Sequence, residues 1–176
     1  MQLLQKREEM VYKIAKIRGS VFVSKQNIPW NDVEQYLKRY IGHSYVVEEY
    51  QDIICISSDF PDEYTESRYT KKLRGALAKV KANAAQIIDL MIENATNRRW
   101  SENKEDKHKY NASGGWFRYD TYFEMSVKGS NETVVRCNQY KATLVVRKTA
   151  RGLFLYDVID IKKEASTPLE SEKTVR

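Results

Sequence analysis

"GGWFRYDTYFEMSV", residues 114–127, begins with a glycine pair and continues with apolar residues at alternate positions. Phe117, Tyr119, Phe123 and Met125 are separated by polar side chains such as Arg118. A period of two is typical of a strand that buries one face, whereas helices repeat about every 3.6 residues. The glycine pair therefore marks the point at which we expect the chain to change from helices to strands.

Two further apolar segments, "TVVRCNQYKATLVVR" (133–147) and "LFLYDVIDIKK" (153–163), follow the turn segments "KGSNE" and "TARG". Short turns between consecutive strands predict an antiparallel meander. The alternation slips at Asn138 and Gln139, which predicts a β-bulge. The last segment is apolar on both faces, which predicts a central strand.

The chain before residue 97 has mainly helical periodicity. We predict amphipathic helices over residues 3–17, over "PWNDVEQYLKRYIG" with Asn31 as N-cap and Gly42 as stop, and over about 71–96. "YVVEE" and "DIICIS" predict a hairpin, and "SVFVS" a short strand or loop. Residues 57–70 are interpreted as a polar loop, and 97–111 as a frayed helix or loop.

Helices that precede strands predict the α+β class. The expected arrangement is N-terminal helices followed by an antiparallel β-meander packed against a long helix. We expect a helical N-terminal extension at 1–43, an α+β domain at 44–165 and a flexible tail at 166–176.

The composition is that of a soluble globular domain, with 41% hydrophobic and 31% charged residues. No apolar run is long enough to span a membrane, and the first residues lack the apolar core of a secretion signal. Cys55 and Cys137 are interpreted as buried free thiols, because a secreted domain more often carries a disulfide framework. We therefore expect a cytoplasmic protein without membrane partners.

Several enzyme classes lack their sequence signatures. The two histidines and two cysteines do not have zinc-ligand spacing. The phosphate-binding loop, the dinucleotide-binding glycine motif and the nucleophile elbow are missing from the sequence. We expect neither a metal site nor a cofactor.

The net charge of +6 is concentrated in "SRYTKKLRGALAKVKANAAQII", residues 67–88. This segment holds six basic residues and no acidic one, whereas the other 24 basic residues equal the 24 acidic ones. The predicted helix places Lys71, Lys72 and Arg74 at its N-terminus, where the macrodipole disfavours cations. A docked phosphate backbone would relieve that cost, although a charged solvated surface is the ordinary alternative. The predicted nucleic-acid-binding cations are Arg68, Lys71, Lys72, Arg74, Lys79 and Lys107, with Lys81 on the same cationic face.

His108 lies in a segment that mixes cations with aromatic residues, which is typical of single-stranded nucleic-acid sites. Metal-free RNA cleavage needs a base for the 2′-hydroxyl, an acid for the leaving oxygen and cations around the phosphate. His108 is the candidate base or acid. Core packing of the rings and ordinary ion pairs of the aspartates remain alternatives. The other candidates are Arg99, Arg118 and Arg147 as phosphate clamps, Trp116, Tyr119, Tyr140 and Tyr156 as stacking or positioning groups, and Asp157 and Asp160 as carboxylates that orient a cation.

The segments "SSDFPDEYT", "YTKKLRGALAKVKANAAQIIDLMIENATNRRWSENKEDKHK", "GWFRYD", "KATLVVRK" and "GLFLYDVIDIKKEASTPLE" resemble a domain of large polyvalent proteins from phages and conjugative elements. That domain is compared with the barnase–EndoU–colicin–RelE nuclease superfamily. The resemblance covers residues 44–169 and implies helices followed by an antiparallel sheet. The sequence departs from the pattern at Phe117, where a tyrosine is expected, and at Lys148, where a histidine is frequent. The implied motif positions are Arg99, His108, Trp116, Arg118, Tyr119, Arg147, Tyr156, Asp157, Asp160 and Lys162.

Three functional hypotheses follow. The first is a metal-independent endoribonuclease of toxin type from a mobile element, acting in a bacterial cytoplasm, with RNA as substrate and a cognate immunity or phage protein as candidate partner. The second is a non-catalytic nucleic-acid-binding or protein-interaction module. The third is an inhibitor-type protein whose basic face contacts an acidic protein surface.

Overall fold

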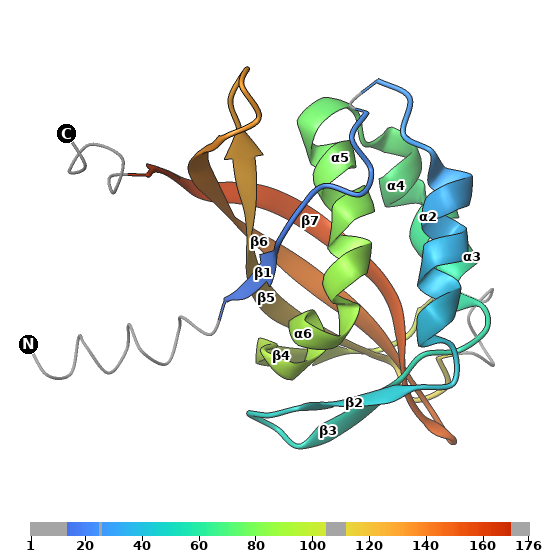
Figure 1. Cartoon of the computed structure of the whole chain (residues 1–176). Coiled ribbons are helices and arrows are strands. Elements are labelled where there is room, and N and C mark those ends of the chain that lie inside the picture. Colours follow the sequence, from blue (N-terminus) through green and yellow to red (C-terminus); the bar gives the residue numbers. More distant parts are fainter. Residues whose placement is uncertain (1–13, 25, 105–111, 170–176) are drawn as a thin grey trace, which may run out of the picture.

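The computed structural model describes residues 14–24, 26–104 and 112–169, and these form a mixed α+β fold with a seven-stranded, curled sheet (Figure 1). The helices lie together on one face of the sheet (Figure 1). In chain order the elements are β1 (Ala15–Ile17), α2 (Trp30–Leu37), the 3-10 helix η1 (Lys38–Tyr40), β2 (Ser44–Val47), β3 (Asp52–Cys55), α3 (Phe60–Glu66), α4 (Arg68–Lys72), α5 (Gly75–Ala84), the 3-10 helix η2 (Ala85–Ile87), α6 (Ile88–Glu93), β4 (Thr96–Ser101), β5 (Trp116–Lys128), β6 (Val134–Thr149) and β7 (Gly152–Pro168).

The sheet has the strand order β1-β5-β6-β7-β3-β2, and β4 also pairs with β5. The predicted meander of β5, β6 and β7 is confirmed as antiparallel, and the predicted hairpin of β2 and β3 is confirmed. The first half of β5 pairs with β4 and its second half pairs in parallel with β1. The start of β7 pairs in parallel with β3, so β7 has strands on both sides there, as its apolar pattern predicts.

The curl of the sheet comes from β7. Its register with β6 shifts at three places, and each shift leaves one extra residue on β7. Such bulges bend a strand and increase its twist, so the sheet wraps around α5. One shift lies between Gln139 and Tyr140, close to the bulge predicted in β6, but the extra residue is on β7, so the strand that carries the bulge differs from the prediction.

The prediction of one long helix over about 71–96 is wrong. The backbone is extended at Leu73 and Arg74, and Gly75 has φ of +66°, so α4 and α5 are separate helices. The predicted apolar face is nevertheless buried at Val80, Ala84 and further along. Lys81, predicted on the cationic face, is instead completely buried.

Two other assignments before the meander are also wrong. The predicted polar loop contains α3, which begins at Phe60 and buries Phe60 and Tyr64 against the core. The segment after residue 96 forms β4 rather than a frayed helix, because its backbone pairs with β5. Both segments are polar, so the sequence pattern did not indicate a helix or a strand. Contacts with residues that are distant in sequence stabilise these two elements.

The N-terminal region differs from the prediction as well. Ala15–Ile17 is a strand, with Ala15 and Ile17 buried and Lys16 exposed, and residues 3–13 of the predicted helix lie outside the described residues. The second helix begins at Trp30 with Pro29 as N-cap, so Asn31 is not the cap. "SVFVS" is a loop. Gly42 ends this helical segment with φ of +85°, as predicted.

One hydrophobic core joins the two sides of the expected boundary at 43/44. Ile17 and Leu37 belong to the same cluster of buried residues as Met91 and Leu144. At the other end, β7 continues to Pro168, past the predicted start of the tail at 166. The remaining tail, residues 170–176, lies outside the described residues.

Candidate functional site

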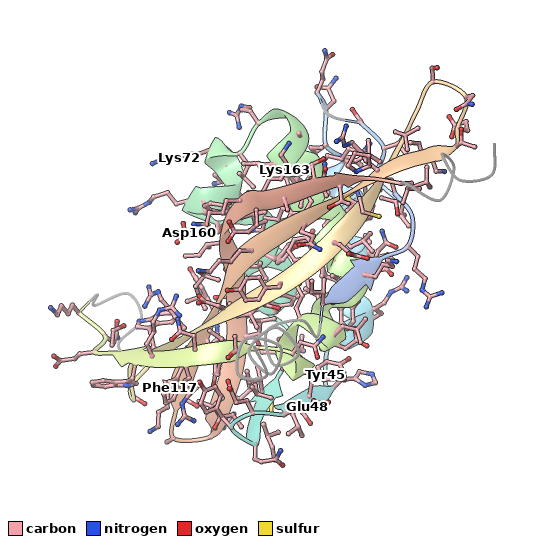
Figure 2. All side chains as sticks on the ribbon, turned by 90° about the vertical axis from the view of Figure 1, so that its left-hand side faces the viewer. Tyr45, Glu48, Lys72, Phe117, Asp160 and Lys163 are labelled. Carbon is pink, nitrogen blue, oxygen red and sulfur yellow. The ribbon has the colours of Figure 1, made fainter. Side chains whose placement is uncertain are left out.

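A cavity of about 620 Å³, here called the cleft, lies where α4, the end of β4 and the meander meet. Trp116, Arg118 and Tyr156 reach it from the sheet face opposite the buried Tyr119 and Leu144, because strand side chains alternate between faces. Figure 2 shows the sheet from this side, with the helices behind it. The cleft is lined by Ser67, Arg68, Tyr69, Ser101, Glu102, Asn103, Lys104, Trp116, Arg118, Val145, Tyr156, Asp157 and Ile159.

Cations and aromatic rings surround the cleft together. Arg68, Lys104 and Arg118 line it, and the ring of Trp116 meets that of Tyr156 edge to face at 5.1 Å. Two side chains are positioned by β4 and the residues after it. Arg118 Nη1 donates to Ser101 Oγ at 3.0 Å, and Trp116 Nε1 donates to Asn103 Oδ1 at 3.3 Å. The sheet and the β4 segment thus hold a guanidinium and an indole side by side.

Asp157, which lines the cleft, belongs to a buried ion pair. Lys81 Nζ on α5 lies 2.6 Å from Asp157 Oδ1 and 2.5 Å from Thr70 Oγ1. The ammonium also lies 4.4 Å from the centre of the Tyr64 ring. Burial raises the pKa of Asp157, an effect that Lys81 opposes, and burial lowers the pKa of Lys81, an effect that Asp157 opposes. Asp157 is therefore a structural partner of Lys81 and adds no uncompensated charge to the cleft.

Three of the predicted catalytic residues lie outside the cleft. Arg147 is nearly buried and makes two hydrogen bonds to Glu63, at 2.8 and 3.0 Å. Tyr119 is fully buried on the helix side and donates to Asp52 Oδ2 at 2.7 Å. Arg99 forms an ion pair with the buried Asp120 at 3.1 Å.

These partners correct the roles expected for Arg147 and Tyr119. Both side chains form hydrogen bonds within the fold, and neither lines the cleft that contains Arg118. Burial raises the pKa of Tyr119 well above its usual range. For Glu63, burial raises the pKa to about 7, and Arg147 opposes this.

The basic residues of segment 67–88 lie in different environments rather than on one face. Lys71 and Lys72 lie at the C-terminal end of α4, where the macrodipole favours cations, so the argument from an unfavourable helix start is wrong for these two lysines, whereas Arg74 is the N-cap residue of α5. Arg74 donates to the carbonyls of Lys71 and Leu73, both at 2.7 Å, and so satisfies backbone acceptors where α4 ends. Of the predicted nucleic-acid-binding cations that the structure describes, Arg68 alone lines the cleft.

Lys79 and Tyr140 lie together in a second pocket, between α5 and the β5–β6 hairpin. Tyr140 is nearly buried, and its ring stacks on that of Phe123. His108 and Lys107 lie outside the described residues. The Lys148 ammonium lies 5.7 Å from the centre of the Phe117 ring.

Sequence reasoning missed several residues that build the cleft. Lys81 sits in an alanine-rich run in which Ala78, Val80 and Ala82 are all buried, and that run was a signal of burial on every side. Ser67 caps α4 by accepting from the Thr70 amide at 3.2 Å. Asn103 lay in a segment without periodicity, so no pattern indicated its role.

The described residues contain no cluster of histidine, cysteine and acidic side chains that would hold a metal ion. Within the same residues no helix has the length and apolarity needed to cross a membrane. Cys55 and Cys137 are free and half-buried.

Comparison with known proteins gives no relative. No protein-family model matches the sequence, and no curated protein or solved structure is significantly similar to it.

Proposed function

We propose that this protein is a metal-independent endoribonuclease that binds single-stranded RNA in the cleft. The observation that supports this most is the composition of one cavity of about 620 Å³, in which Arg68, Lys104 and Arg118 lie around Trp116 and Tyr156. Cations neutralise phosphates and aromatic rings stack on bases, and RNA is recognised chiefly through such unpaired bases.

The cations of the cleft suit a phosphodiester. A guanidinium donates two parallel hydrogen bonds to phosphate oxygens, and Arg118 already has its orientation restricted by Ser101. Glu102 is the one acidic lining residue other than Asp157, and Lys81 compensates Asp157. The balance of charge in the cleft is therefore positive, which favours an anionic ligand.

In the proposed reaction, a ribose 2′-hydroxyl attacks the adjacent phosphorus while a base takes its proton. The P–O5′ bond breaks, an acid protonates the leaving O5′, and the products carry a 2′,3′-cyclic phosphate and a 5′-hydroxyl. His108, which follows Lys104 by four residues in the sequence, is the proposed base or acid. Arg118 and Arg68 would stabilise the charge on the phosphate in the transition state.

The test is incubation of a labelled single-stranded RNA with the full chain in a chelator. We expect cleavage with a 2′,3′-cyclic phosphate end, loss of cleavage in His108→Ala, and weaker binding by Arg118→Ala. The binding affinity should fall steeply with salt, and Arg118→Ala should reduce the salt slope by about one. Arg151→Ala is the matched control, because Arg151 is exposed in the β6–β7 turn and is not among the residues that line the cleft. Equal binding by the two variants would exclude the cleft as the RNA site.

A second candidate is a binding module without catalysis. It is favoured by the contacts of Arg147, Tyr119 and Asp157, which tie up three of the expected catalytic side chains. Tight RNA binding that depends on Arg118 but never gives cleavage would select this function. Mobile-element origin, cytoplasmic location and a cognate immunity or phage protein as partner are further parts of the proposal, and they rest on the sequence resemblance.

A further inference from the structure

A second cavity, of about 410 Å³, lies between the loop after β1, α5 and the far end of the β5–β6 hairpin, and is here called the α5 pocket. Its volume is in the range of small-molecule sites. One part of its wall is apolar, with Val23, Val80 and Val127, and Arg18 contributes a cation. It shares no lining residue with the cleft.

The loop that forms one wall is held in place by a buried asparagine. Asn83 Oδ1 accepts from the amides of Val21 and Phe22, at 2.9 and 3.1 Å, and its Nδ2 donates to the Phe22 carbonyl at 2.8 Å. Asn83 is completely buried on α5, so these bonds are shielded from water. The pocket is therefore preformed, and a ligand would not have to order this wall.

Two features of the pocket are unexplained by the fold alone. Asn138 Oδ1 is buried without a hydrogen-bond partner among the described residues, whereas native structures satisfy most such atoms. Val23 is 69% exposed, whereas its neighbour Phe22 is buried. A ligand in the pocket would supply a donor to Asn138 and cover Val23.

The charges of the pocket indicate the ligand's sign. Three basic side chains line it, Arg18, Lys79 and Lys128, and one acidic side chain, Glu132, lies 3.7 Å from Lys128. The basic lining residues therefore outnumber the acidic one, which favours an anionic ligand. We propose that the α5 pocket binds a small amphipathic anion, with an anionic group beside Arg18, an apolar body against Val23, Val80 and Val127, and a hydrogen-bond donor at Asn138 Oδ1. This site is independent of RNA binding in the cleft.

The test is titration of the ¹⁵N-labelled full chain with 4-hydroxybenzoate, which combines the three features. Benzoate lacks the donor, 4-hydroxybenzyl alcohol lacks the anion, and inorganic phosphate lacks the apolar body. We expect saturable shifts of the Val23 and Val127 amides and of the Asn138 side-chain amide with 4-hydroxybenzoate below about 10 mM. Benzoate and the alcohol should each bind about tenfold more weakly, and phosphate should cause no shift at these residues.

Two variants test whether the ligand binds in the α5 pocket. Ala76→Phe puts a ring into the pocket from an exposed position on α5 and should abolish binding, whereas Ala150→Phe, at an exposed position of the β6–β7 turn, should not. Arg18→Gln should lower the affinity for 4-hydroxybenzoate about tenfold and leave the affinity for 4-hydroxybenzyl alcohol unchanged. This variant tests the site even if Ala76→Phe does not fold. The proposal is wrong if no probe shifts these residues in the wild type, if phosphate alone shifts them equally, or if Arg18→Gln binds like the wild type.

Discussion

Replacement of Lys81 by methionine tests the buried ion pair between Lys81 and Asp157. Methionine keeps most of the length of the side chain but removes the charge that lies 2.6 Å from Asp157. Both side chains are nearly inaccessible, at 0% and 2%. Removing one partner of a buried pair costs about 3–5 kcal/mol, because the remaining charge is neither solvated nor paired.

The loss should depend on pH in a defined direction. Without Lys81 the burial of Asp157, which already raises its pKa, acts unopposed by the ammonium. A carboxyl whose folded pKa exceeds its unfolded pKa stabilises the fold below the unfolded pKa, and this contribution is lost as the pH rises through the folded pKa. We therefore expect Lys81→Met to be more destabilising at pH 8 than at pH 5.

The measurement is the free energy of unfolding from urea titration at both pH values. Lys72→Met is the control, because Lys72 is exposed and its loss should change stability by less than about 0.5 kcal/mol. The double variant Lys81→Met/Asp157→Leu should recover most of the loss, since an apolar pair of similar volume avoids the desolvation of two charges. If Lys81→Met is as stable as the control, or if the double variant is no better than Lys81→Met, the reasoning fails.

Two further predictions concern the backbone and the pH dependence of stability. Gly115→Ala should lower the free energy of unfolding by about 3 kcal/mol, because Gly115 has φ of +90° and a Cβ would lie 2.5 Å from the Ser101 carbonyl oxygen. The control is Gly152→Ala, at a position with φ of +132° and open space around a Cβ. It should lower the free energy of unfolding by only about 1 kcal/mol in the same urea titration. Burial raises the pKa of Glu63 to about 7 from 4.5, so its stabilising contribution is complete below pH 4.5 and disappears as the pH rises through about 7. Relative to Glu63→Gln, the wild type should therefore lose about 3 kcal/mol between pH 4 and pH 8, and parallel pH curves would contradict this.

Part of the candidate site was predictable from local pattern. Trp116 was predicted from the interleaving of rings and cations near His108, Arg118 as a phosphate clamp and Tyr156 as a positioning group, and all three line one cavity. Arg147 and Tyr119 fit the same pattern but are used by Glu63 and Asp52, their partners from other parts of the chain. Residue type alone does not distinguish an arginine that awaits a ligand from one that has a partner.

The sequence by itself determined the meander and its turns, because the alternation of strand side chains and the chemistry of turns are local properties. It also indicated, through helical periodicity, that Val80, Ala84, Ile88 and Met91 are buried.

Only the tertiary structure decided where the charges lie. Lys81 is buried because Asp157, 76 residues away in sequence, meets it beneath the cleft. Ala15–Ile17 became a strand because β5 offered it a free edge. The free energy of burying a charge, and that of pairing a strand edge, depend on two segments that are distant in sequence. Neither outcome can therefore be predicted from one segment alone.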